Sequence, residues 1–264
     1  MGHIAIIGGT GICDPTMLDH VTSGQMENYY GTIRYTRGTY KGKEIIFLAR
    51  HGKYHSIPPH LINYRANILG LKKLGVTAIL STTAVGAINR DYEPDEFVLP
   101  DQFIDFTSHS RHGSFFDGGS NGVVHVDMTG PYCPSLRETV VQAAQDLSYA
   151  LHPAGTYVCT EGPRFETPAE IKMFDKLGGD IVGMTNVPEV CLAREAEMCY
   201  ATISMVTNYA AGISPVPLTH AEVVEKMVQN SKRLRKLVMH TVDLYDDRDC
   251  SCRHTLKDYG GFSV

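Results

Sequence analysis

Short apolar runs that end in small or polar residues recur along this chain, and they constrain its fold more than any other feature. The runs and the residues that follow them are His3–Ile7 before Gly8-Gly9-Thr10-Gly11, Glu44–Ala49 before Arg50-His51-Gly52, Val76–Leu80 before the small residues 81–86, Asp180–Met184 before Thr185, and Tyr200–Val206 before Thr207-Asn208. Runs of this length, bounded by small residues, are typical of buried strands. We therefore predict five strands, with a small-residue turn over 81–86 after the third.

Helical patterns separate these runs. The apolar residues between Pro59 and Leu74 recur at helical spacing and Gly75 supplies a C-terminal stop, Pro188 opens a segment through Glu197, and a long helix runs from Ala221 to Tyr245. Strands that alternate with helices form a largely parallel sheet covered on both faces. A length of 264 residues with 43% hydrophobic residues fits one α/β domain over 1–264.

The charge balance argues against general binding to polyanions. Lys and Arg total 24 against 29 Asp and Glu, a net charge of −5, so neither nucleic acid nor an anionic membrane is an expected partner. No stretch approaches the roughly 20 apolar residues of a membrane helix, and the start lacks a basic signal-peptide region. We expect a cytoplasmic protein that holds any anion at a local site.

The seven cysteines do not resemble a secreted disulfide framework. Most stand in apolar segments and are expected to be buried small side chains. Cys250-Ser251-Cys252 is too short a cluster for a four-ligand zinc site without His254 or another residue. The pair fits either a vicinal redox pair or two ordinary thiols, and we expect the second.

Polar residues gather where the predicted strands end. These residues are Thr10, Arg50, His51, Thr83, Ala84, Thr185 and Asn208. Ligands of open α/β sheets bind beyond the carboxyl ends of the strands. Hydroxyls, turn amides and a guanidinium suit a tetrahedral oxyanion, which Arg can hold with two parallel bonds. The combination predicts a phosphate cradle.

Each part of this cradle also has a simpler interpretation. Gly9-Thr10-Gly11 lacks the third glycine of a dinucleotide fingerprint, because Asp14 stands in its place, and no Lys-Ser or Lys-Thr closes a Walker loop. Arg50-His51 alone fits a surface turn. Thr82-Thr83 alone fits ordinary strand-end chemistry.

Together, six blocks resemble the trimeric purine nucleoside phosphorylases, and most closely their methylthioadenosine phosphorylase branch. The blocks are Ile6-Ile7-Gly8-Gly9-Thr10-Gly11, Leu48-Ala49-Arg50-His51-Gly52, Asn63-Tyr64-Arg65-Ala66-Asn67, Thr82-Thr83-Ala84, Glu161-Gly162-Pro163-Arg164-Phe165-Glu166-Thr167 and Met184-Thr185-Asn186-Val187-Pro188-Glu189. The resemblance implies the nucleoside phosphorylase fold, a single domain with a mixed, largely parallel sheet, a distorted barrel-like core and flanking helices.

The resemblance also implies roles for individual residues. Those implied to bind phosphate are Thr10, Arg50, His51, Thr83, Ala84 and Thr185, and those implied to contact the nucleoside are Phe165, Met184, Asn208, Tyr209, Ala210 and His125. Phe165 would pack against the purine and Met184 would lie along the ribose. His125 matches a histidine that reaches into a neighbouring subunit, which implies a homotrimer or a dimer of trimers, although a loop histidine satisfied by backbone is the alternative.

The implied reaction is attack of phosphate on the anomeric carbon through an oxocarbenium-like transition state, with no covalent intermediate, metal or cofactor. The cradle would hold phosphate in line beneath the sugar, and its negative charge would stabilise the developing cation. A donor must meet N7 of the departing purine, and no residue is identified as a general acid.

Glu166 and Asn208 depart from the methylthioadenosine branch and match the inosine and guanosine branch. A 6-oxopurine presents an N1–H donor with acceptors at O6 and N7, so a carboxylate suits N1–H and an amide suits O6 and N7. Adenine presents the opposite pattern, and unpaired polar groups would cost orders of magnitude in specificity. We therefore predict hypoxanthine or guanine as the leaving base. As alternatives, Glu166 fits a first-turn helix charge and Asn208 a turn residue.

His220 bears on the 5′ group of the sugar. Methylthio-specific relatives have an apolar residue there, whereas a histidine in the inosine branch bonds the 5′-hydroxyl, so His220 favours an ordinary nucleoside. A helix cap is its alternative role. The competing functions are phosphorolysis of methylthioinosine or methylthioadenosine, and non-catalytic nucleoside binding.

Overall fold

The computed structural model describes residues 2–9, 12, 14–52, 54, 56–108, 111–214 and 220–263, with the backbone alone for Ser120 and 220–223. The strands are β1 (His3–Gly8), β2 (Asp19–Asn28), β3 (Gly31–Tyr40), β4 (Lys43–Ala49), β5 (Val76–Ala87), β6 (Phe97–Val98), β7 (Gln102–Phe106), β8 (Leu151–His152), β9 (Thr156–Thr160), β10 (Ile181–Gly183) and β11 (Cys199–Tyr209). The α-helices are α1 (Tyr64–Lys73), α2 (Pro134–Asp146), α3 (Pro168–Lys176), α4 (Asn186–Glu195) and α5 (His220–Leu244). Short 3-10 helices include η1 (Pro15–Met17), η2 (Pro59–Leu61), η4 (Gly119–Asn121), η5 (Ser251–His254) and η6 (Lys257–Tyr259).

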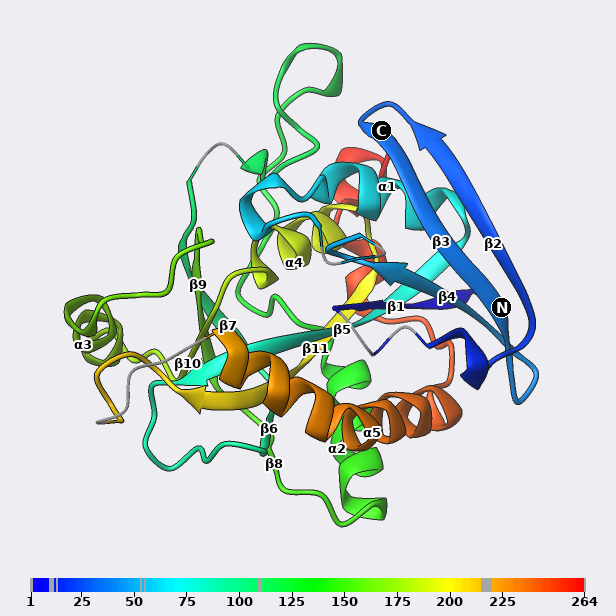
Figure 1. Cartoon of the computed structure of the whole chain (residues 1–264). Coiled ribbons are helices and arrows are strands. Elements are labelled where there is room, and N and C mark those ends of the chain that lie inside the picture. Colours follow the sequence, from blue (N-terminus) through cyan, green and yellow to red (C-terminus); the bar gives the residue numbers. More distant parts are fainter. Residues whose placement is uncertain are drawn as a thin grey trace.

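One mixed sheet of eleven strands runs through the molecule (Figure 1). Its main path is β2-β3-β4-β1-β5-β10-β9-β7, and β11 leaves this path by pairing with β5 and β6. Strands β1, β4, β5 and β11 are parallel to their neighbours in this group, whereas β10 runs antiparallel to β5. The expected mixed, largely parallel sheet with flanking helices is confirmed, and the sheet is open rather than a closed barrel.

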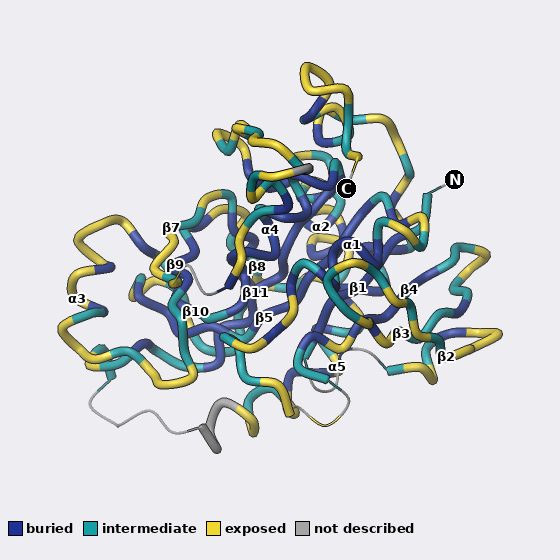
Figure 2. Tube along the Cα trace, turned by 90° about the horizontal axis from the view of Figure 1, so that it is seen from above, coloured by how far each residue is buried: buried dark blue, intermediate teal, exposed yellow. Residues whose placement is uncertain are grey.

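Alternating side chains of the central strands enter two different cores. In β1, Ala5 and Ile7 pack with α1 and α4, whereas Ile4 and Ile6 pack with α2 and α5. Successive strand residues point to opposite faces, so a strand that is covered on both faces is apolar throughout. Figure 2 shows the resulting buried centre with exposed outer loops. Among the described residues, no helix combines the length and hydropathy needed to cross a membrane.

The small-residue turn predicted over 81–86 is wrong, because this segment continues β5 as far as Ala87. Strands on both sides supply hydrogen-bond partners, and small side chains let those strands approach. At Gly86 an added Cβ would lie only 3.1 Å from Asn208 Nδ2 and 3.3 Å from Ala210 Cα. The glycine therefore reflects close strand packing rather than a turn.

The predicted helices are present with shifted ends. Helix α1 begins later than expected because the Asn63 side chain accepts from the Ala66 backbone N–H at 3.0 Å and forms the N-cap. Leu61 precedes that cap and is 65% exposed. Helix α4 covers Asn186–Glu195, and α5 matches the predicted C-terminal helix within one residue at each end. The hairpin of β2 and β3 was not predicted, because its sequence is largely polar and exposed.

Candidate active site

A cavity of about 460 Å³ opens beside the ends of β1, β4, β10 and β11 and along the second half of β5. The sequence-predicted residues that line it are Arg50, His51, Thr83, Ala84, Thr185, Phe165, Met184, Asn208, Ala210 and Glu166. Among the described residues, Tyr209 is half-buried within β11 and His125 is exposed, and neither lines this cavity. Thr10 and the side chain of His220 lie outside the described residues.

Arg50 is the most buried charge at the cavity, and Glu189 of α4 neutralises it. Arg50 Nε donates to Glu189 Oε2 at 2.7 Å, and Arg50 Nη2 donates to Glu189 Oε1 at 2.8 Å. Their side chains are 2% and 0% exposed. From the sequence, we expected the two parallel bonds of Arg50 to hold a bound anion. In the structure they are made to the Glu189 carboxylate of the same chain.

Two further bonds fix the plane of this guanidinium. Arg50 Nη1 donates to the Thr82 carbonyl at 2.9 Å and Nη2 to Ser81 Oγ at 2.5 Å. Four of the five N–H groups are then used, and within the described part of the chain one on Nη1 remains for a ligand. Burial by itself would lower the pKa of Arg50, but the charge and hydrogen bonds of Glu189 outweigh it and raise that pKa.

Thr82, Thr83 and Thr185 also line the cavity. Thr83 Oγ1 lies 2.9 Å from Ser204 Oγ on the paired strand β11. Thr185 occupies the N-cap position of α4, yet its side chain makes no capping hydrogen bond. Thr82 Oγ1 is buried and has no hydrogen-bond partner among the described residues. Successive strand residues point to opposite faces and Thr82 Oγ1 is enclosed, so the hydroxyls of Thr83 and Thr185 are the two that suit a polar ligand.

The other end of the cavity carries Asn208 and Glu166. A register shift between Val206 and Asn208 places Asn208 opposite Gly86 on β5, and such bulges re-aim a side chain next to a binding site. Gly86 stands three residues beyond Thr83 along β5. The rise of a strand therefore separates the two ends of the cavity by about 10 Å.

Neighbouring hydroxyls orient both of these side chains. Thr207 Oγ1 donates to Asn208 Oδ1 at 2.7 Å, and Asn208 Nδ2 donates to the Tyr209 carbonyl at 2.8 Å, which leaves a second N–H on that nitrogen. Thr160 Oγ1 donates to Glu166 Oε1 at 2.6 Å. The amide therefore offers a donor, and the carboxylate keeps Oε2 as an acceptor.

Arg111 fastens the two chain segments that frame the cavity. Its Nη1 donates to the carbonyls of Met184 and Val187 at 2.8 Å each, and its Nη2 donates to the carbonyls of Thr160 and Glu161. The side chain is buried against Tyr64. One guanidinium thus joins the end of β9 to the end of β10.

The first described turns of α5 form an apolar wall. Val224, Met227 and Val228 line the cavity there, and Val224 and Val228 are 47% and 68% exposed. At the rim, His51 Nδ1 lies 2.9 Å from the Ile57 carbonyl oxygen. A carbonyl only accepts, so Nδ1 carries a proton. Phe165 is 37% exposed at the edge of the cavity.

The sequence signature of the Phosphorylase superfamily matches residues 3–243. This chain belongs to the phosphorylase superfamily. It is 53% identical over 257 residues to a probable 6-oxopurine nucleoside phosphorylase of Dictyoglomus turgidum, covering 97% of each chain. It is 50% identical over 267 residues to the 6-oxopurine nucleoside phosphorylase of Pyrococcus furiosus, covering 99% of this chain and 100% of the relative.

A solved relative of this superfamily member has the same fold. Methylthioadenosine phosphorylase from Schistosoma mansoni, in complex with adenine, superposes with a TM-score of 0.90 at 33% identity and covers 98% of this chain and 96% of its own. Similarity over almost the whole length of both proteins extends the family assignment to all the strands that frame the cavity.

Several residues that contact the cavity lining of this phosphorylase-superfamily chain were not predicted from the sequence. Glu189 follows a helix-opening proline and resembles an ordinary first-turn charge. Nothing in the local sequence links it to Arg50, 139 residues away. Arg111 stands in a loop without a motif, and Ser204 lies inside an apolar strand. The structure alone brings these three residues to the site.

Proposed function

We propose that this protein is a purine nucleoside phosphorylase that cleaves inosine and guanosine with inorganic phosphate, giving the free base and ribose 1-phosphate. The observation that carries the proposal is the pairing, on one cavity, of a carboxylate and an amide at one end with buried hydroxyls and Arg50 at the other. The activities named for the Dictyoglomus and Pyrococcus relatives support it.

Phosphate binds in this proposal between Thr83, Thr185 and the remaining N–H of Arg50, together with His51 and the backbone at Ala84. These groups hold the nucleophile in line with the anomeric carbon, which is an orientation effect. As the glycosidic bond breaks, the sugar becomes positively charged, and the anionic oxygens beneath it stabilise that charge. Phosphate is a co-substrate, and the proposed step uses no metal or cofactor.

The base is read by hydrogen-bond polarity. Glu166 Oε2 accepts from N1–H of a 6-oxopurine, while the second N–H of Asn208 donates to N7 or O6. Adenine has a bare N1 lone pair, which would face the carboxylate and leave a buried polar group without a partner. Phe165 packs against the ring, and Met184 lies along the ribose.

Methylthioinosine is the second candidate substrate. The apolar wall of Val224, Met227 and Val228 favours a thioether at the 5′ position. His220 favours a hydroxyl through the chemistry of its ring. Because the two features point to different 5′ groups, the relative rates of inosine and methylthioinosine decide between them.

We also propose a homotrimer in which the exposed His125 completes the cavity of a neighbouring subunit. The enzyme would work in the cytoplasm, where thiols such as its seven cysteines stay reduced. A molecular mass measured in solution by light scattering tests the assembly. If the trimer forms and His125→Ala leaves kcat/KM for nucleoside unchanged, the proposed role of His125 is wrong.

The direct test incubates the protein with inosine, guanosine, methylthioinosine or methylthioadenosine, each with and without phosphate, and measures the released base. We expect phosphate-dependent release from the 6-oxopurine nucleosides. A preference for methylthioadenosine would contradict the role of Glu166 and Asn208. Release without phosphate would indicate a hydrolase, and inosine binding without release would indicate a non-catalytic binding protein.

A paired variant tests how the base is read. Glu166→Ser with Asn208→Asp should shift the ratio of kcat/KM for inosine over adenosine by about 100-fold or more toward adenosine, the scale of a hydrogen-bond mismatch. His220→Val is the matched control at the other end of the sugar, and it should favour methylthioinosine without changing the choice of base. An unchanged inosine preference in the paired variant would show that these residues do not read the purine.

A further inference from the structure

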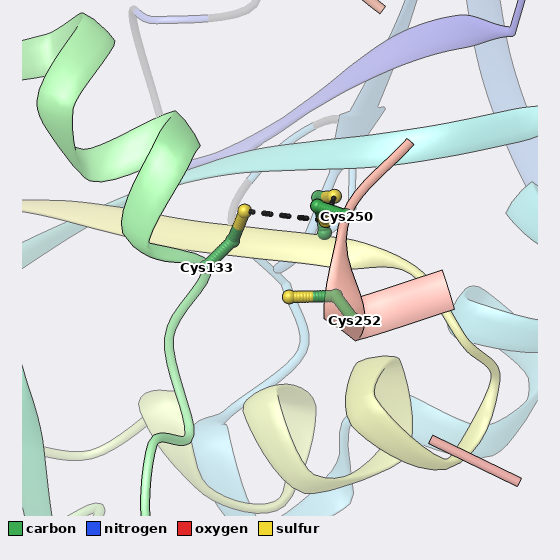
Figure 3. Close-up of side chains that lie close together, drawn as sticks. Cys133, Cys250 and Cys252 are labelled. Carbon is green, nitrogen blue, oxygen red and sulfur yellow. Dashed lines mark hydrogen bonds between the residues drawn. The ribbon is translucent and has the colours of Figure 1, made fainter. Parts of the chain in front are cut away.

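Four cysteines from three distant parts of the sequence meet at the other end of the molecule from the cavity. Cys133 is the N-cap residue of α2, Cys199 begins β11, and Cys250 and Cys252 lie at η5 in the C-terminal segment. Figure 3 shows the labelled side chains of Cys133, Cys250 and Cys252 converging. From the sequence alone, only Cys250 and Cys252 are neighbours, and both were predicted to be ordinary thiols.

The sulfur atoms have the spacing of a metal-ligand shell. All four lie within 4.8 Å of one another, with Cys133 Sγ 3.9 Å and Cys199 Sγ 3.1 Å from Cys250 Sγ. Four sulfurs at about 2.3 Å from a tetrahedral zinc ion stand about 3.8 Å apart. A disulfide needs about 2.05 Å, and the six free cysteines of the described chain include all four.

The surroundings of the four sulfurs suit a closed metal site. Cys133, Cys199 and Cys252 are at most 3% exposed, so water is largely excluded. The Leu136 backbone N–H donates to Cys133 Sγ at 3.5 Å. Contacts of this kind stabilise and orient metal-bound sulfur.

We propose that Cys133, Cys199, Cys250 and Cys252 bind one Zn²⁺ ion as four thiolates. Four protein ligands leave no open coordination position, so the site is structural rather than catalytic. It would fasten the C-terminal segment to the first residues of α2 and β11. Cys199 and Asn208 are nine positions apart in β11, about 30 Å of strand, so the ion takes no part in chemistry at the cavity.

His254, the sequence-based candidate for a fourth ligand, is not one of these four. Its ring Nε2 lies 2.7 Å from Asp249 Oδ1, and the side chain is 55% exposed. The other two ligands are instead Cys199 and Cys133, which precede Cys250 by 51 and 117 positions. Metal binding by these residues therefore depends on the folded chain, and the folded state gains stability from the ion.

The test uses the full chain, purified under reducing conditions from zinc-supplemented medium. We expect one zinc per chain by elemental mass spectrometry. Replacement of zinc by Co²⁺ should give the sulfur-to-cobalt charge-transfer and ligand-field absorption bands of a tetrahedral tetrathiolate site. Cys250→Ser with Cys252→Ser should lose the zinc and these bands, while Cys191→Ser, at a half-buried cysteine outside the cluster, should keep both.

Thermal unfolding provides a readout for structure. A strong chelator should lower the Tm of the wild type and of Cys191→Ser, and leave the Tm of the double variant unchanged. Wild-type protein whose thiols are all reduced, yet which binds neither zinc nor Co²⁺ at these sulfurs, would overturn the proposal. Disulfides among the four cysteines in protein kept under reducing conditions would overturn it as well. The wild-type cobalt spectrum decides the question even if the double variant does not fold.

Discussion

Replacing Glu189 by leucine should destabilise the protein strongly, because it leaves the buried charge of Arg50 without a counter-ion. Glu189 accepts four hydrogen bonds, two from Arg50, one from Ser81 Oγ at 3.0 Å and one from the Tyr200 hydroxyl at 2.8 Å. With Arg50 only 2% exposed, water cannot replace the lost carboxylate. Removing one partner of a buried ion pair costs about 3–5 kcal/mol. At roughly 2–4 °C per kcal/mol, the Tm should fall by about 6–20 °C.

The double variant Arg50→Met with Glu189→Leu separates structure from catalysis. It removes both charges, and the groups left without their partner are neutral, namely the hydroxyls of Ser81 and Tyr200 and the Thr82 carbonyl. The double variant should therefore regain about 2–3 kcal/mol relative to Glu189→Leu. Phosphorolysis should be lost in this double variant, because the proposed phosphate contact of Arg50 is gone. Urea unfolding gives the stability, and base release from inosine gives the activity.

A control on the same helix sharpens this comparison. Glu195 is also buried and accepts from Ser114 Oγ and from the Phe115 backbone N–H, but it pairs with no cation among the described ion pairs. Glu195→Leu should therefore cost less than Glu189→Leu. If Arg50→Met with Glu189→Leu is as unstable as Glu189→Leu alone, the unpaired charge of Arg50 is not the cause of the lost stability. Wild-type activity in the double variant would refute the phosphate role of Arg50.

Three further changes have separate expected outcomes. Arg111→Met should lower kcat/KM for inosine by at least about ten-fold in steady-state kinetics, because four carbonyls of the segments beside the cavity lose their common donor. Unchanged kinetics would mean that these segments keep their positions without Arg111. Thr83→Val should raise the KM for phosphate about ten-fold, the effect of one hydrogen bond of about 1.4 kcal/mol, and an unchanged phosphate KM would remove Thr83 from the cradle. Burial opposes ionisation of Asp247, but hydrogen bonds led by that from Arg253 outweigh it and lower the pKa of Asp247 to about 2. Its stabilisation of about 2 kcal/mol is therefore complete above pH 4 and lost as the pH falls through 2, so Asp247→Asn should cost that amount in urea unfolding at pH 6 and little at pH 2.

The sequence predicted those parts of the fold that local pattern determines. Continuous apolar runs marked β1, β4 and β11, and helical spacing marked α5, because a buried strand or an amphipathic helix must repeat its apolar residues at a fixed period. The end of β5 did not follow this rule. Residues 81–86 are small and polar, and they extend as a strand because their neighbours pair with them.

Partners that are distant in sequence were beyond local reasoning. The residues around the cavity were found by their positions at strand ends and by resemblance, but Glu189 as the partner of Arg50 was not, since 139 residues separate them. The same holds for Cys133 and Cys250, which are 117 positions apart. No period or short motif carries information over such separations, which only the folded topology closes.

The neutralised arginine has a consequence for the order of events during turnover. Because Glu189 already balances Arg50, a phosphate dianion entering as proposed would keep much of its charge unquenched. The affinity of the resting enzyme for phosphate would then be modest. The remaining negative charge would instead stabilise the sugar as it becomes cationic. In this way the Glu189 carboxylate would weaken electrostatic stabilisation of the resting complex and leave more of it for the transition state of bond cleavage.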